Sequence, residues 1–273
     1  MAREHLARLR PGLLALILLT GAPASVDAQS PASRLEGMWS DPPTTAEGLF
    51  CFFACTDAGI ARLNALLDDP ANDARPFQEL QAEAKRFERE YIRSRLTAAA
   101  LTRYPFDPAD DPGFLRCEPW GAARQLFAPH QLEIRQRGAD RFELRYGEWD
   151  GRRTIYLDGR PRPASQAPTA MGHSVGRWEG ETLVVETSGI AANIIMLPDL
   201  AAMGEHSDQL RVVERYMRST DGGALLLTAT LTDPRILREP LVLKKIWRWA
   251  PEQQITPYES CERPTEVKRG VRP

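Results

Sequence analysis

A histidine and a glutamate share one stretch of the chain, Met171–Gly189, in which apolar residues alternate with polar ones. The alternation on both sides of Glu179-Gly180 predicts two antiparallel strands joined by a two-residue turn, since glycine suits the positive φ of such turns. In that register His173 lies directly opposite Glu186. A carboxylate raises the pKa of a neighbouring imidazole and orients its ring, which prepares a general acid or base. The stretch therefore predicts a catalytic dyad of His173 and Glu186.

Two other interpretations of this hairpin stay open. The pair could be an ordinary pair on the solvent side of the sheet, which contributes little to stability. A three-residue turn with a bulge would shift the pairing by one residue and place Glu186 on the opposite face from His173. The dyad therefore depends on the register at Glu179-Gly180.

A second group of reactive side chains begins at His206, in a turn that precedes a predicted strand bearing Glu214. Loops at a barrel mouth often contain functional residues, so we predict His206 and Glu214 as further catalytic candidates. With His130, these histidines raise the question of zinc. Neither a His-x-His nor a His-Glu-x-x-His spacing is present, so we expect no metal.

Aromatic and cationic side chains are frequent in the same part of the sequence. In a closed barrel every second residue of a strand faces the interior, and aromatic rings with a few polar groups suit an apolar or aromatic ligand. Packing of a filled core explains most of these rings equally well. We predict as ligand-binding residues Tyr146, Trp149, Tyr156, Trp178, Tyr216 and Arg215.

All these residues lie in or beside eight predicted strands. From Gln131 onward branched and aromatic residues alternate with polar ones, and Gly, Asp or Pro turns separate the segments. Regular short strands without helices between them indicate an antiparallel meander, and eight strands can close a barrel around one small ligand. A sandwich is the alternative. The predicted strands are 131–136, 141–149, 153–158, 171–178, 181–188, 210–218, 224–232 and 241–249.

The part before the sheet is predicted to be mostly helical, after a short strand at Leu35–Trp39. Thr56 can cap a helix that ends before Pro70, and Pro76 opens a longer amphipathic helix. Because these helices precede the strands, the predicted fold class is α+β, an eight-stranded antiparallel β-barrel preceded by an N-terminal helical segment. The expected division is residues 1–28 as signal peptide, 29–128 as the N-terminal strand and helical segment packed on the barrel, and 129–273 as the antiparallel barrel domain.

The first 28 residues have the features of a secretory signal peptide. Arg3, Arg8 and Arg10 precede the apolar run Gly12–Leu19, and Val26-Asp27-Ala28 fits a cleavage site. The apolar run is too short to span a membrane. We therefore expect an exported protein, periplasmic or secreted after cleavage near Ala28, without a membrane span.

Charge and glycine patterns exclude two classes of partner. The formal net charge is −2 and there is no basic stripe for phosphate contacts, which argues against nucleic acid. The sequence also lacks a Gly-rich phosphate loop. We therefore expect no cofactor.

Four cysteines, an even number in an exported chain, predict up to two disulfides. We favour Cys117 with Cys261, which would tie the C-terminal tail to the loop before the sheet, and a local bridge between Cys51 and Cys55. A redox or metal role for the local pair is the alternative, but its spacing is neither Cys-x-x-Cys nor a zinc pattern.

Three stretches, Arg153–Arg160, Met171–Gly189 and His206–Arg215, resemble a family of exported bacterial proteins of unassigned function. The family reads close to Arg-x-Ile-Tyr-x-Asp-Gly-Arg, Met-Gly-His-Ser-Ile-Gly-Arg-Trp-Glu-Gly-Asp-Thr-Leu-Val-Val-Asp-Thr and His-Ser-Glu-x-Leu-x-Val-Val-Glu-Arg. The resemblance implies that the dyad and the His206 turn form one recurrent constellation, with glutamate in place of aspartate at 186. The helical part departs from the family. A weaker resemblance, to lipocalins, lies in Gly37-x-Trp39 and implies a lipocalin-like barrel. The residues carried over are His173, Ser174, Trp178, Thr187, His206, Glu214 and Arg215.

These observations predict an exported barrel that binds a small apolar or aromatic molecule. With His173 as acid or base it would be a cofactor-independent lyase, isomerase or hydrolase. Without chemistry it would be a carrier. A barrel interior filled by side chains would favour a third class, an envelope interaction protein.

Overall fold

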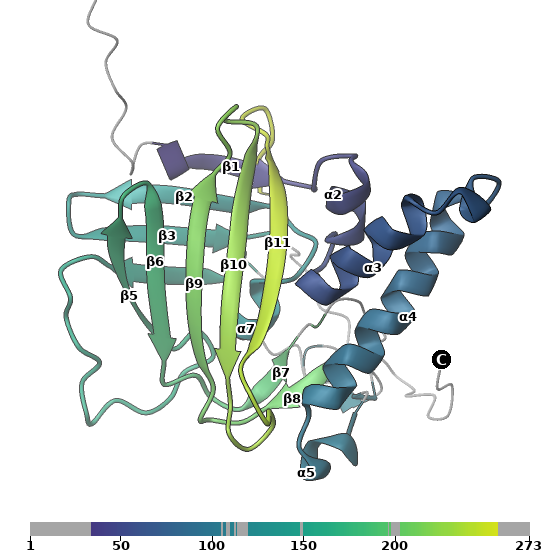
Figure 1. Cartoon of the computed structure of the whole chain (residues 1–273). Helices are drawn as coiled ribbons and strands as arrows, with labels where there is room; N and C mark the ends of the chain where they lie inside the picture. Colours follow the sequence, from purple (N-terminus) through teal and green to yellow (C-terminus); the bar gives the residue numbers. More distant parts are fainter. Residues whose placement is uncertain are drawn as a thin grey trace, which may run out of the picture.

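The computed structural model describes residues 34–104, 106–107, 110–111, 113, 120–147, 150–195, 197 and 203–255 (Figure 1). The predicted signal peptide, residues 1–28, lies outside this part of the chain. Trp149, Cys117 and Cys261 also lie outside it, and with these cysteines the disulfide predicted between them.

The centre of the fold is a closed barrel, in which the described residues form nine strands in the order β1-β11-β10-β9-β6-β5-β4-β3-β2. All eight predicted strands are present. The barrel strands are β1 (Gly37–Ser40), β2 (Leu132–Arg137), β3 (Arg141–Tyr146), β4 (Arg152–Tyr156), β5 (His173–Glu179), β6 (Thr182–Ser188), β9 (Arg211–Arg218), β10 (Ala224–Thr232) and β11 (Leu241–Trp249). Two short strands, β7 (Asn193–Ile195) and β8 (Gly204–His206), form a separate sheet.

The barrel differs in two ways from the predicted eight-stranded antiparallel meander. The ninth strand is β1, which comes from the N-terminal part and closes the barrel by pairing with both β2 and β11. Strands β4 and β5 run parallel, with Ile155 opposite Ser174. Parallel strands need a long crossover connection, and residues 157–172 provide it by returning the chain to the end of the barrel at which β4 began. The barrel is therefore mixed rather than antiparallel.

The turn between β5 and β6 is not the predicted Glu179-Gly180 turn. Glu179 pairs with Thr182, so the turn residues are Gly180 and Glu181. Gly180 has a φ of +62°, whereas Glu181 has no positive φ. This is the pattern of a type II′ turn, which places glycine at the first central position, while the prediction placed it at the second.

This turn shifts the hairpin by two residues from the predicted register. His173 lies opposite Ser188, and Glu186 lies opposite Val175. Side chains alternate between the two faces of a strand, so a shift of two leaves each side chain on the same face as before. It does, however, remove Glu186 from the position facing His173.

The two predicted helices are confirmed, and they pack against each other beside β11 (Figure 1). Thr56 caps the first, since its hydroxyl oxygen accepts a hydrogen bond of 3.0 Å from the Gly59 amide. The second begins directly after Pro76. The described helices are α2 (Ala46–Phe50), α3 (Asp57–Leu67), the 3-10 turn η1 (Pro70–Asn72), α4 (Phe77–Arg95), α5 (Ala98–Leu101) and α7 (Ala122–Gln125).

The predicted local disulfide between Cys51 and Cys55 is present, and both cysteines are fully buried. It constrains the segment between α2 and α3. The same segment is joined to the barrel, because the backbones of Cys55 and Lys244 exchange two hydrogen bonds of 3.0 and 2.8 Å. The disulfide therefore shapes the contact between the helical part and β11.

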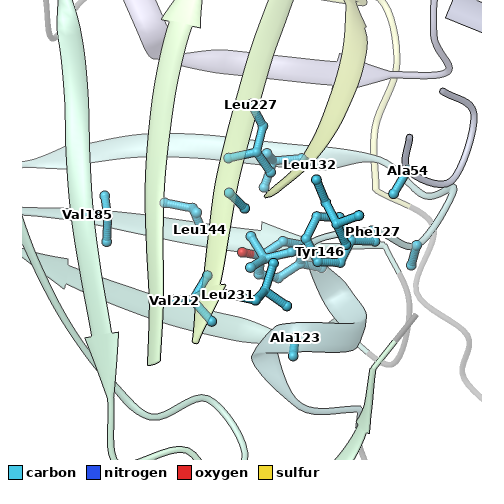
Figure 2. Close-up of a cluster of buried hydrophobic side chains, with 14 of the residues drawn as sticks. Ala54, Ala123, Phe127, Leu132, Leu144, Tyr146, Val185, Val212, Leu227 and Leu231 are labelled. Carbon is cyan, nitrogen blue, oxygen red and sulfur yellow. The ribbon is translucent and has the colours of Figure 1, made fainter. Parts of the chain in front are cut away.

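Large side chains fill the middle of the barrel. Trp39 and Trp247 are 0% and 2% exposed and belong to one hydrophobic cluster that extends around the barrel. Figure 2 shows part of this cluster, in which Leu144 and Tyr146 of β3 and Leu231 of β10 extend into one interior. The sequence left open whether the barrel interior is a ligand-lined cavity or a packed core. At this level of the barrel, the described residues form a packed core.

Candidate functional site

His173 and Glu186 lie on the outer face of the barrel and do not contact each other. The His173 ring stacks on Tyr156, with 5.3 Å between the ring centroids, and its Nε2 is 3.0 Å from the Arg160 carbonyl oxygen. Glu186 instead pairs with Arg177, at 2.7 Å. The predicted pairing of His173 with Glu186 is wrong, because the shifted hairpin register separates the two residues.

The predicted ligand-binding residues divide between the two faces of the barrel. Tyr146 and Tyr216 are buried inside, and Trp178 is partly buried against the same interior cluster. Tyr156 lies outside, beneath the stacked histidine, and Arg215 is exposed on the outer face. The prediction that Tyr156 and Arg215 line the interior with the other candidates is therefore wrong. Both residues alternate along their strands with inward-facing residues, so their own side chains point outward.

A buried ion pair inside the barrel joins Arg153 of β4 to Glu214 of β9. The guanidinium binds both carboxylate oxygens, with Nη1 2.8 Å from Oε2 and Nη2 2.6 Å from Oε1, and the two side chains are 1% and 0% exposed. Such bidentate pairs are among the strongest hydrogen-bonded contacts in proteins. Burial disfavours the charged form of Arg153, but the attraction of Glu214, its hydrogen bonds and the neighbouring Tyr146 and Tyr216 together outweigh this effect and raise the pKa of Arg153 well above its ordinary value.

Three hydroxyl groups complete this network. The Ser174 oxygen accepts a 2.8 Å hydrogen bond from Arg153 Nε and lies 3.0 Å from the Thr187 hydroxyl, which donates to Glu214 at 3.2 Å. The Tyr216 hydroxyl donates to the other Glu214 oxygen at 2.7 Å, and burial together with the charge of Glu214 raises the pKa of Tyr216. Both oxygens of Glu214 are thus engaged, and this predicted catalytic residue is the anionic partner in a structural network.

The network also shows where the residues of the family resemblance lie. Ser174, Thr187 and Glu214 meet inside the barrel, while His206 is at the barrel mouth. The central residue, Arg153, is absent from the predicted site. Its position two residues before the buried Ile155 is the sequence signal that could have placed it inside.

A cavity of about 270 Å³ lies at the barrel mouth formed by the loop between β10 and β11. In Figure 1 this loop, α5 and the β7–β8 sheet lie together at the lower end of the barrel. Most of the lining is apolar. The apolar residues that line the cavity are Leu96, Ala99, Ala100, Ile195, Leu197, Leu210, Leu231, Ile236, Leu237 and Leu241.

His206, the last residue of β8, lines this cavity and is only 4% exposed. Its Nδ1 is 3.0 Å from the carbonyl oxygen of Ser207, whereas its Nε2 is buried without a hydrogen-bond partner among the described residues. Burial lowers the pKa of His206, and this effect outweighs the opposite influence of the Ser207 hydrogen bond and of Asp233. The imidazole is therefore neutral at neutral pH.

Asp233 fixes the turn that orients His206. One carboxylate oxygen accepts a 2.7 Å hydrogen bond from the Ser207 amide, and the other accepts a 2.8 Å bond from the Ser207 hydroxyl. Asp233 is 1% exposed and follows β10 directly. The cavity wall thus includes a polar turn of defined geometry beside a mostly apolar lining.

Lys245 is a buried titratable residue that the sequence analysis did not single out. Its Nζ donates to the carbonyl oxygens of Phe52, Phe53 and Phe127 at 2.8, 3.1 and 3.4 Å. Burial lowers the pKa of Lys245 to about 7, although Asp41 acts in the opposite direction. Alternation along β11 with the buried Trp247 could have indicated an inward-facing lysine. Its contacts join the disulfide segment to the barrel, which indicates a structural role.

The free energy of unfolding should rise as the pH increases from about 7 towards 10.5, because in this window the unfolded state binds a proton that folded Lys245 does not. Urea denaturation at a series of pH values measures the slope. Lys245→Met should flatten it, while Lys244→Met, at the partly exposed neighbouring position, should retain it. Equal slopes for the wild type and Lys245→Met would contradict the assignment of this pH dependence to Lys245.

The sequence comparisons identify no family or curated protein whose site could be transferred to this chain. No family model matches the chain, and no curated protein matches it significantly. Among the helices of the described ranges, none has the length and apolar character needed to cross a bilayer. The same ranges hold no group of three or more His, Cys, Asp or Glu side chains arranged for a metal ion. The cavity beside His206 is therefore the candidate site.

Proposed function

We propose that the protein is an exported, lipocalin-like barrel that binds a small, largely apolar molecule in the cavity at the barrel mouth. One observation is decisive for this proposal: His206 is buried in the wall of an apolar cavity, and its Nε2 has no partner among the described residues. A buried polar atom without a hydrogen bond is costly, so its presence beside a cavity calls for an explanation. A bound molecule that contacts Nε2 supplies one.

The size of the cavity limits the ligand. Its volume of about 270 Å³ is near the lower end of ordinary ligand sites. A dry protein cavity of roughly 150 Å³ is large enough for benzene. A molecule the size of two fused aromatic rings, or an aliphatic chain of similar volume, therefore suits this cavity.

Binding without catalysis fits the geometry better than acid–base catalysis. The paired carboxylate and imidazole on which the enzyme hypothesis depended do not meet, and Glu214 is held by Arg153, Thr187 and Tyr216. His206 remains as a polar group at the cavity, and one such group is enough to orient a ligand. The packed middle of the barrel supports the alternative of an envelope interaction protein, while the mouth cavity favours a carrier.

A substitution on α5 tests whether the cavity is the binding site. Ala100→Phe places a large ring in the cavity lining, so binding of naphthalene measured by equilibrium dialysis should weaken at least about tenfold. Ala98→Phe is the matched control, because Ala98 lies on the same helix, is exposed, and is not part of the lining. Equal affinities in the two variants would place the binding site elsewhere, and no binding by the wild type would remove the proposed function.

A further inference from the structure

The His206 ring has a defined arrangement of donor and acceptor. A carbonyl oxygen can only accept, so the 3.0 Å contact with the Ser207 carbonyl requires the hydrogen on Nδ1. In a neutral imidazole the other nitrogen then has a free lone pair. Nε2 of His206 is therefore a buried hydrogen-bond acceptor at the cavity wall.

We infer that the ligand is a neutral alcohol or phenol, whose apolar body fills the cavity and whose hydroxyl group donates a hydrogen bond to His206 Nε2. This inference rests on the proposed function and adds the chemical class of the ligand. Only a donor satisfies the lone pair. A hydrocarbon leaves the acceptor unpaired, and a ketone or ester presents a second acceptor to it.

The charged residues around the cavity are engaged with one another or with the adjacent turn. Arg103 pairs with Glu205, and Asp233 accepts hydrogen bonds from the turn after β8. The guanidinium of Arg235 lies 3.8 Å from the carboxylate of Asp208. A ligand carboxylate would compete with Glu205 and Asp208 for these cations and would place a charge beside an apolar lining, which is unfavourable.

The polarity of the cavity also disfavours a cationic ligand. An ammonium group can donate to Nε2, but its transfer from water into an apolar cavity is costly unless an anion pairs with it. Of the two lining anions, Asp233 already accepts hydrogen bonds from the Ser207 amide and hydroxyl, and Glu205 pairs with Arg103. A neutral hydroxyl group satisfies the acceptor without this cost.

Three probes of similar shape separate these classes: naphthalene, naphthol and naphthoate. Equilibrium dialysis with the mature protein near neutral pH should give naphthol an affinity about tenfold to a hundredfold higher than naphthalene, since one buried acceptor becomes satisfied. Naphthoate should bind more weakly than naphthol. This comparison uses the unmodified protein and needs no variant to fold.

A pair of histidine variants assigns the preference to one nitrogen. His206→Phe removes the acceptor and should reduce the preference for naphthol over naphthalene to less than about threefold. His173→Phe, a matched substitution on the outer face, should leave the preference unchanged. Circular dichroism of both variants confirms that they are folded.

The possible outcomes distinguish this inference from the proposed function. If naphthalene and naphthol bind equally well and Ala100→Phe weakens both, the cavity binds ligands but the inferred class is wrong. A naphthol preference that persists in folded His206→Phe also overturns the inference. If none of the three probes binds, the proposed function and the inference are both wrong.

Discussion

Glu214→Leu is expected to lower the free energy of unfolding by about 3–5 kcal/mol, the cost of leaving a buried charge without its partner. Arg153 would keep its positive charge in a site where it is 1% exposed and where Glu214 accepts two of its hydrogen bonds. The Tyr216 hydroxyl would lose its acceptor as well. Urea denaturation followed by circular dichroism measures the change.

The double variant Arg153→Met/Glu214→Leu shows whether the loss comes from the unpaired charge. Apolar side chains of similar volume often replace a buried ion pair with little net loss, so the double variant should recover most of the stability. The surface pair of Arg177 and Glu186 is the control, and Glu186→Leu should change stability by less than about 1 kcal/mol. A double variant that is less stable than Glu214→Leu would show that the network stabilises the fold through more than charge pairing.

Trp39→Ala should lower the free energy of unfolding by about 3–5 kcal/mol, because a large buried ring is replaced by a cavity. Trp39 is 0% exposed, and its Nε1 donates a 3.0 Å hydrogen bond to the Leu35 carbonyl oxygen. Its ring packs edge-on against Trp249, with 4.8 Å between the ring centroids. Strand β1 has only four residues and pairs with β2 and β11 to close the barrel. Its anchoring therefore depends strongly on this side chain.

Loss of β1 would expose the edges of β2 and β11, and exposed strand edges promote aggregation. We therefore expect Trp39→Ala to aggregate on heating at a lower temperature than the wild type, as measured by light scattering. Val242→Ala on β11 is the control, because Val242 is 38% exposed and its truncation should change stability by less than about 1 kcal/mol. Similar aggregation temperatures for the two variants would contradict an anchoring role for Trp39.

The packed core and the cavity at the mouth serve different purposes in this fold. The ion-pair network and the hydrophobic cluster fill the middle of the barrel. The cavity lies where α5, the β7–β8 sheet and the β10–β11 loop meet at one end. Such connecting segments tolerate variation better than strands do, which makes the mouth the more suitable place for specific recognition.

Features with local causes could be predicted from the sequence. The cap at Thr56 and the proline at 76 set the starts of α3 and α4, and alternation located eight barrel strands within a few residues. The bridge between Cys51 and Cys55 closes a short segment and is likewise local. The structure places His206 at the end of the short strand β8, which was not predicted, in the lining of the cavity at the barrel mouth.

The candidate site could be predicted only in part, because contacts between distant strands depend on register and closure. A shift of two residues leaves every side chain on its face, so hydrophobic alternation cannot distinguish the predicted partner of His173 from the observed one. The position of Gly180 in its turn decided between them.

The sequence by itself therefore determined helices α3 and α4, the eight predicted barrel strands and the local disulfide, since each follows from residues close together in the chain. Only the tertiary structure decided that β1 closes the barrel, that β4 and β5 run parallel, and that Arg153 meets Glu214 in the interior. It also decided that a cavity forms beside His206. These features arise when the barrel closes and brings together segments far apart in sequence, and no short-range pattern encodes that closure.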